Sequence, residues 1–284
     1  MDVFEIMGTV RGYSRLRRPE DIADLVLLRH RNMAQMAVCQ ALLPVFKQYL
    51  IKSVTQASIS GTRVTIPGDS LTLINVEREQ TAGANNYRPA APVKVEDKVY
   101  INISPDLVSS PANPLYVDEG RYLNLYPSMS GLDVRLSYRK RIADMVYNKI
   151  AAVIGEPNGS SQFTMTVGAS LDDDVYNDYQ VAIYKVNSGV HTLLGVHTIT
   201  DYIGLSRTVT IDPASDIVAG DEAYYALVPI IPSEFHNLLV DATLVELKKG
   251  GFDVPELTSE ASLYSRINVI LVSNGYGKFD RGAN

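Results

Sequence analysis

The sequence predicts an α+β fold: a discontinuous helical bundle with a small antiparallel sheet, plus an inserted all-β module of the sandwich or barrel kind. Apolar residues recur every three or four positions near both ends of the chain, which is the period of a helix with one buried face. Over residues 58–138, and again over 163–227, the period falls to two, as it does in strands. Clusters of glycine and proline separate these blocks.

The pattern divides the chain into three segments. We expect residues 1–155 to form the first part of a helical and β body, 156–230 the inserted β module, and 231–284 the second part of the body. The two helices expected in the last segment each carry one apolar stripe. Their own segment cannot bury these stripes, so they need the early helix and the early sheet as packing partners.

A long helix is predicted over residues 19–54. Pro19 and the acidic residues that follow it suit a first helical turn. Pro44 should kink or restart the helix, because proline lacks a backbone donor and crowds the preceding turn. One stripe at helical spacing is expected to form the buried face, and its members are Ile22, Leu25, Val26, Met33, Met36, Ala37 and Leu43.

The remaining elements alternate between strand and helix patterns. Helical spacing returns over 139–154, and residues 163–227 form a separate block of strands. Two helices follow, over 233–249 and 255–272, before a polar, glycine-rich tail. The polar stretch 83–92 is expected to be a loop. The short strands of the first β block are expected at 64–66, 71–74, 99–103, 122–126 and 134–138.

Composition excludes several classes of protein. The 284 residues are 46% hydrophobic and 20% charged, which is an ordinary globular composition. The net charge of −6 argues against a generic nucleic-acid binder, and the single cysteine, Cys39, excludes an internal disulfide framework and a cysteine-based metal cluster. The first residues lack the pattern of a signal peptide, and no apolar stretch is long enough for a membrane span. The sequence therefore predicts a soluble intracellular protein.

The signatures of common enzymes do not occur in the sequence. We find no P-loop, no HExxH, no GxSxG and no dinucleotide fingerprint, so we expect a protein that is not an enzyme and that needs no cofactor. The strongest carboxylate cluster runs from Asp172 to Asp174. A solvated acidic turn is the favoured interpretation. A metal-dependent hydrolase that uses this cluster with His191 or His197 is the alternative.

Basic residues gather near the start of the chain. Solvated faces or salt bridges between subunits are their default roles, and phosphate contact is possible if an oligomer points them at one axis. We predict these residues as candidates for a DNA channel or an interface: Arg11, Arg15, Arg17, Arg18, Arg29 and Arg31.

Three stretches carry a resemblance to a known family. Residues 118–127 read DEGRYLNLYP, 133–139 read DVRLSYR, and 231–240 read IPSEFHNLLV. In this order they resemble the head-to-tail adaptor (connector) proteins of tailed bacteriophages. In that family a strand ending in tyrosine and a basic residue precedes a helix that opens with a proline and a histidine, matched here by Pro232 and His236.

The second β block resembles a β module of phage structural proteins. Its matching stretches are DDVYNDYQVAI at 173–183, TITDY at 198–202 and RTVTIDP at 207–213. The chain departs from the adaptor pattern in two ways, because this module is inserted after the tyrosine strand and because the first helix is longer than usual.

The resemblance implies a structural virion protein that forms a ring in the phage neck, with twelve copies as in the family. The expected partners are other copies of the chain, the portal protein, tail or other neck proteins, and genomic DNA that passes without sequence-specific binding; no membrane partner is expected. The expected location is the head–tail interface of the virion, after synthesis in the host cytoplasm. A negative net charge suits a channel in which DNA slides freely.

The C-terminal tail is expected to become ordered on assembly. Its candidate partner-docking residues are Tyr276, Phe279 and Arg281. The alternative function is a receptor- or carbohydrate-binding tail or fibre protein, which the tyrosine-rich block from Tyr176 to Tyr225 suggests.

Overall fold

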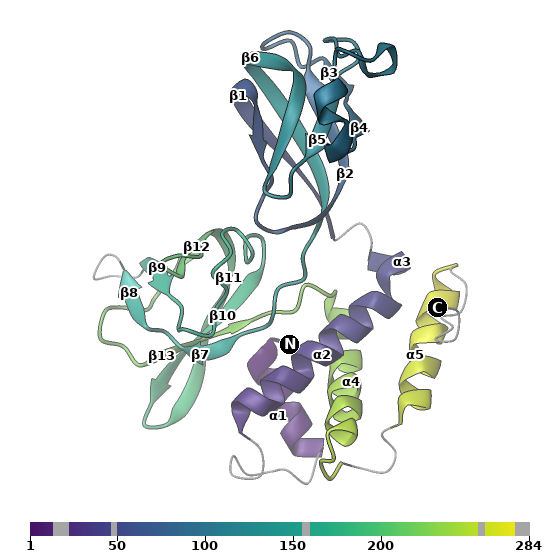
Figure 1. The fold of residues 1–284 in the computed structure, drawn as a ribbon. Helices are drawn as coiled ribbons and strands as arrows, with labels where there is room; N and C mark the ends of the chain where they lie inside the picture. The colour runs from purple at the N-terminus through teal and green to yellow at the C-terminus, as the bar shows by residue number, and fades with distance from the viewer. Residues whose placement is uncertain (14–22, 47–49, 155–159, 255–258, 276–284) are drawn as a thin grey trace. The chain divides into compact units, whose positions relative to one another are not determined.

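A computed structural model describes residues 1–13, 23–46, 50–154, 160–254 and 259–275. The chain forms two compact units, shown in Figure 1: unit 1 is Met1–Tyr49 with Ile142–Asn284, and unit 2 is Leu50–Arg141. Residues 50–141 are expected to belong to the first segment of the body, and in the structure they form a separate unit inserted between the two parts of unit 1.

The predicted fold class is wrong. Strands make up 40% of the structure and helices 29%, and the strands form two large curled sheets instead of one small sheet on a helical bundle. Both β blocks contain strands, as their period of two predicts, but these strands are longer than expected, for example β1 Ile51–Thr65 and β6 Tyr122–Lys140. Long curled sheets bury most of their apolar side chains on their own concave face, so they do not need a helical bundle as a core.

Unit 2 is built around one long central strand, β6. The sheet order is β3-β2-β6-β5-β4, and β1 pairs with β6 along its other edge. The pairing of β1 with β6 shifts register between Gln56 and Arg63, near Gly61 and Gly131, whose φ values of 94° and 64° favour glycine. The strands are β1 Ile51–Thr65, β2 Ser70–Glu79, β3 Tyr87–Pro89, β4 Ala91–Val93, β5 Leu115–Asp118 and β6 Tyr122–Lys140.

The ribbon of β1 and β6 curls back on itself. The amide of Ile66 donates to the carbonyl of Arg121 at 3.0 Å, and the amide of Arg141 donates to the carbonyl of Asp69 at 2.6 Å. The two ends of β6 therefore lie beside the same short turn, 66–69. The concave side holds a small core that includes Val64, Val76, Leu123, Leu125, Val134, Leu136 and Tyr138.

Unit 1 contains a second sheet, which curls into a near-barrel, called the barrel below. Its order is β7-β13-β10-β11-β12-β9-β8, so β7 and β8 lie at opposite edges although only two residues separate them in the chain. The amide of Ile150 donates to Ala223 at 2.8 Å, and that of Ala151 donates to Thr164 at 2.9 Å. The strands are β7 Tyr147–Lys149, β8 Ala152–Ile154, β9 Ser160–Thr164, β10 Gln180–Asn187, β11 Val190–Ile203, β12 Thr208–Ser215 and β13 Ala223–Leu227.

The helix predicted over 139–154 is therefore wrong. Residues 147–154 pair with β13 at one end and with β9 at the other. Short apolar runs fit a helix or a strand equally well, and here two open sheet edges supply the hydrogen-bond partners that decide the choice.

Five α-helices occupy the described part of unit 1, together with the 3-10 helix η4 Ser233–Phe235: α1 Val3–Tyr13, α2 Asp24–Ala41, α3 Leu43–Phe46, α4 His236–Lys249 and α5 Glu260–Ser273. Helix α4 packs against α1, α2 and α5. The two C-terminal helices are confirmed, although α5 starts at Glu260, where Ser259 accepts from the amide of Ser262 at 3.1 Å. The first predicted helix is only partly confirmed, because residues 51–54 belong to β1.

None of the helices in the described residues is long and apolar enough to cross a membrane. The stretch expected to be a polar loop, 83–92, contains the short strand β3 and the start of β4.

A buried hydrogen bond fixes the turn 66–69 to β6. The hydroxyl of Tyr138 donates to Oδ1 of Asp69 at 2.6 Å, and neither residue has exposed surface. Lys52 Nζ lies 3.7 Å from Oδ2 of the same carboxylate. The Asp69 carboxylate thus connects the turn, β1 and β6.

We predict that Tyr138→Phe lowers the free energy of unfolding by about 1–3 kcal/mol, because a buried carboxylate oxygen loses its donor. Chemical denaturation measures this value. Tyr122→Phe is the control: Tyr122 is half-buried, its ring stacks with Arg63 at 4.7 Å, and phenylalanine keeps that contact, so a change within about 0.5 kcal/mol is expected. Equal small effects for both variants would show that the hydroxyl contributes nothing.

Candidate functional site

Helix α2 turns its apolar stripe toward solvent. The exposed fractions are 76% for Leu25, 48% for Met33 and 42% for Met36. The buried face carries the polar residues Arg31 and Gln35 among small apolar ones. The predicted buried face of this helix is therefore wrong. Of the other stripe members, Val26 and Ala37 are exposed, Leu43 is half-buried and Ile22 lies outside the described residues.

Hydrogen bonds explain this orientation. Asn32 donates from Nδ2 to the carbonyl of Met145 at 3.2 Å, and its Oδ1 accepts from the amide of Met145 at 2.9 Å. Gln35 donates from Nε2 to the carbonyl of Ala143 at 3.1 Å. Side-chain amides of α2 thus satisfy the backbone of the segment that leads into β7, which requires that face to point inward.

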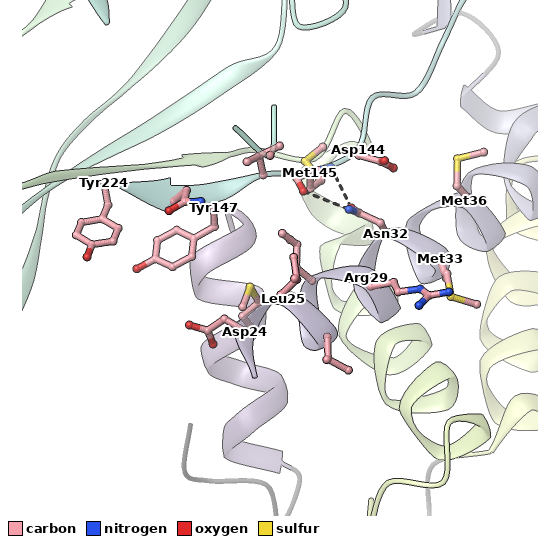
Figure 2. Close-up of a pocket in the computed structure, with 16 residues that line it drawn as sticks. Asp24, Leu25, Arg29, Asn32, Met33, Met36, Asp144, Met145, Tyr147 and Tyr224 are labelled. Carbon is pink, nitrogen blue, oxygen red and sulfur yellow. Dashed lines mark hydrogen bonds between the residues drawn. The ribbon is translucent and has the colours of Figure 1, made fainter. Parts of the chain in front are cut away.

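A groove of about 830 Å³ lies between the outer face of α2 and the segment 144–148. Figure 2 shows Asn32 joined to Met145 beside it, with Met33 and Met36 along the helix. Met7, Met33, Met36 and Met145 all line the groove, so it contains four of the seven methionines of the chain. Methionine is flexible and polarizable, which suits a surface that adapts to a partner.

Charged and aromatic side chains border this methionine groove. Asp24 pairs with Arg11 at 2.6 Å. Arg29 and Asp144 are exposed and make no ion pair or side-chain hydrogen bond with any described residue. Tyr147 and Tyr224 stack with ring centroids 5.8 Å apart, and burial raises the pKa of Tyr147, so its hydroxyl stays neutral.

The sequence indicated only part of this groove. The methionines on the α2 stripe are a visible signal, since Met33 and Met36 lie within one helical turn of each other. Met7, Asp144 and Met145 come from distant parts of the chain, and no pattern in the sequence connects them with α2.

The structure describes three of the six candidate arginines, and only Arg29 is exposed at the groove without an ion-pair partner among the described residues. Arg11 is held by Asp24, and Arg29 lies exposed at the methionine groove. Arg31 is fully buried and leaves no surface for contact with DNA or another subunit. The remaining candidates lie outside the described residues: Arg15, Arg17, Arg18 and the tail residues Tyr276, Phe279 and Arg281.

The environment of Arg31 is unusual for a cation. Its Nη1 donates to Gln35 at 3.2 Å and to Asn32 at 3.4 Å, while Nε and Nη2 have no hydrogen-bond acceptor among the described residues. No carboxylate pairs with it there. Burial lowers the pKa of the Arg31 guanidinium to about 9. The charged form therefore destabilises the folded state at neutral pH.

The carboxylates and histidines of the hydrolase alternative do not converge. Asp173 accepts from the amide of Gly204 at 2.7 Å, and Asp174 accepts from Asn177 at 2.7 Å, as in a structured turn. His191 packs among aromatic rings, with Phe4 5.1 Å away, and His197 contacts the carbonyl of Pro213. Within the described residues, no three His, Cys, Asp or Glu side chains are placed to hold a metal ion.

The tyrosines that suggested a glycan-binding surface are covered by other parts of unit 1. Tyr224 is half-buried, and the other five between 176 and 225 are buried: Tyr176, Tyr179, Tyr184, Tyr202 and Tyr225. The specific observation behind the receptor-binding alternative is therefore lost, and this block does not offer a tyrosine-rich surface.

We predict that Arg31→Met raises the free energy of unfolding at pH 7 by about 1–3 kcal/mol, because methionine fills similar space without a buried, unpaired charge. The wild-type penalty is full below pH 9 and shrinks as the pH rises above that value, so the gain should shrink in the same direction. Denaturant titrations at several pH values measure it, with the exposed Arg29→Met as the control. Destabilisation by Arg31→Met would mean that the charge has a favourable partner.

A comparison of the chain with protein-family models and with curated proteins finds no match in either set.

Proposed function

We propose that this protein is a non-enzymatic structural subunit of a tailed-phage virion, which assembles with copies of itself into a ring of the neck. The ring would join the portal to the tail and surround the passing DNA. The apolar face that α2 presents to solvent is the observation that carries the assembly part of this proposal. The resemblance of three sequence stretches to neck adaptors supports the virion part.

The α2 face has the character of an interface. Contiguous apolar surface is uncommon on monomeric proteins and marks sites that other molecules cover. Full burial of an exposed leucine or methionine side chain contributes about 1.5–3 kcal/mol, and Leu25, at 76% exposed, can gain most of that amount. A helix that stays in water is expected to expose polar side chains, whereas α2 buries Arg31 and Gln35 and exposes Leu25, Met33 and Met36.

The geometry of a ring fits a surface of this kind. Each subunit of a closed ring contacts its two neighbours through two different patches. One patch would be the methionine groove beside α2. The negative net charge would keep the DNA from binding tightly, because affinity for phosphate needs many cations.

The support for a phage neck comes from sequence alone. The helical bundle that the resemblance implies is not the fold observed, and the matching stretches 118–127 and 133–139 belong to unit 2, whereas 231–240 belongs to unit 1. His236, the matched histidine, contacts the carbonyl of Ile231 through Nε2 at 2.8 Å, which explains locally why a histidine opens α4.

We predict that the wild-type chain forms a ring in solution, or assembles on the portal protein encoded by the same genome. The double variant Met33→Asp/Met36→Asp should remain monomeric in both settings, because association would bury two carboxylates without partners. Light scattering on a sizing column measures the mass, and circular dichroism checks that the variant is folded.

Leu205→Asp is the matched control. Leu205 lies in the same unit, is 86% exposed and does not line the groove, so its replacement should leave the assembly mass unchanged. A wild-type chain that is monomeric alone and also with portal would contradict the proposed function.

A further inference from the structure

We propose that the methionine groove receives the C-terminal segment 276–284 of a second copy of this chain, with Tyr276 and Phe279 inserted among the methionines. This inference rests on the proposed function in one respect, namely that copies of the chain associate. It adds the identity of the segment that fills the groove.

The chemistry of the segment matches that of the groove. Residues 276–284 read YGKFDRGAN, so two aromatic rings lie within four residues. Aromatic side chains anchor many interfaces, and methionine sulfur makes favourable contacts with aromatic rings. Of the four methionines that line the groove, Met33 and Met36 are exposed, and they offer contacts for such anchors together with the half-buried rings of Tyr147 and Tyr224.

The charges are complementary as well. The segment carries Lys278, Asp280 and Arg281. The groove carries Asp144 and Arg29, which have no ion-pair partner in the described part of the chain. A segment with both signs of charge can pair with each of them, whereas a purely basic or acidic one can pair with only one.

The two aromatic residues follow α5 too closely to reach the groove of their own copy. Helix α5 is tied to α4 by the ion pairs Arg266–Asp241 and Lys249–Glu260, and α4 packs against the inner face of α2. Figure 1 shows α4 between α2 and α5. Packed helices lie about 8–10 Å apart, so the axis of α5 is about 16–20 Å from that of α2, and the groove is on the far side.

The number of residues between α5 and Phe279 shows whether the segment fills the groove of its own copy or that of a second copy. Tyr276 directly follows the last described residue, Gly275, and Phe279 is four residues beyond that glycine. Four fully extended residues span at most about 14 Å, which does not reach around two helices. A second copy can approach the groove from solvent without this limit.

The test uses two full-length variants that each lose one half of the contact. The groove variant is Met33→Asp/Met36→Asp, and the segment variant is Tyr276→Ser/Phe279→Ser. In light scattering of the protein alone or mixed with portal, whichever setting gives wild-type assembly, each should have a lower mass than the wild type. A mixture of the two should form a one-to-one pair of twice the monomer mass, because one copy still has an intact segment and the other an intact groove.

A peptide experiment tests the contact without any ring. A fluorescein-labelled peptide of residues 274–284 is titrated with the segment variant, whose groove is intact, and anisotropy reports binding. Adding Met33→Asp should weaken binding at least tenfold, and adding Asp144→Asn should weaken it severalfold and reduce its salt dependence. Leu205→Asp, added as the control, should have no effect.

The failures of the two proposals are distinguishable. A peptide that does not bind, a segment variant that assembles like the wild type, or a mixture that stays monomeric overturns the assignment of segment 276–284, even if a ring forms. A wild-type chain that associates neither with itself nor with portal overturns the proposed function, and peptide binding would then still report on the groove.

Discussion

The backbone amides and carbonyls of Ala143 and Met145 form their hydrogen bonds with side chains. Asn32 satisfies both the amide and the carbonyl of Met145, Gln35 satisfies the carbonyl of Ala143, and the hydroxyl of Tyr179 accepts from the amide of Ala143 at 2.8 Å. Buried backbone groups without partners are costly, so this segment fixes α2 on one side and the barrel on the other. The orientation of α2, and with it the methionine groove, follows from these few bonds.

This arrangement of α2 lowers the free energy of unfolding of the isolated subunit. Turning the amides of α2 inward also brings Arg31 into the interior, where its guanidinium lacks a carboxylate among the described residues. It also leaves Leu25, Met33 and Met36 in water. A monomer would gain from the opposite arrangement. The sequence of α2 is better suited to a subunit whose outer face is covered by another molecule, which is the basis of the proposed assembly.

Tyrosine hydroxyls give the barrel of unit 1 its internal polar contacts. Tyr176 accepts from the amide of Ser170, Tyr202 donates to the carbonyl of the same residue, and Tyr225 bonds with Thr166. Each ring fills the core while its hydroxyl holds the loop 166–170 across the barrel. The abundance of tyrosine in this chain, which has 17 and no tryptophan, therefore reflects in part this barrel and its loops.

The sequence by itself determined the local elements with a strong period. Helices α4 and α5 and the strands around 122–126, 134–138 and 209–211 follow from their spacing, and Gly250 and Gly251 end α4 as expected. Only the tertiary structure decided that 147–154 is a strand, because that choice depends on two sheet edges supplied by residues far along the chain. It also decided which face of α2 is buried. Apolar spacing favoured the methionine face, but the backbone of Ala143 and Met145 lies outside the sheets and needs the side-chain amides of α2 as partners. Hydrogen bonds with such distant residues leave no periodic signal in a sequence.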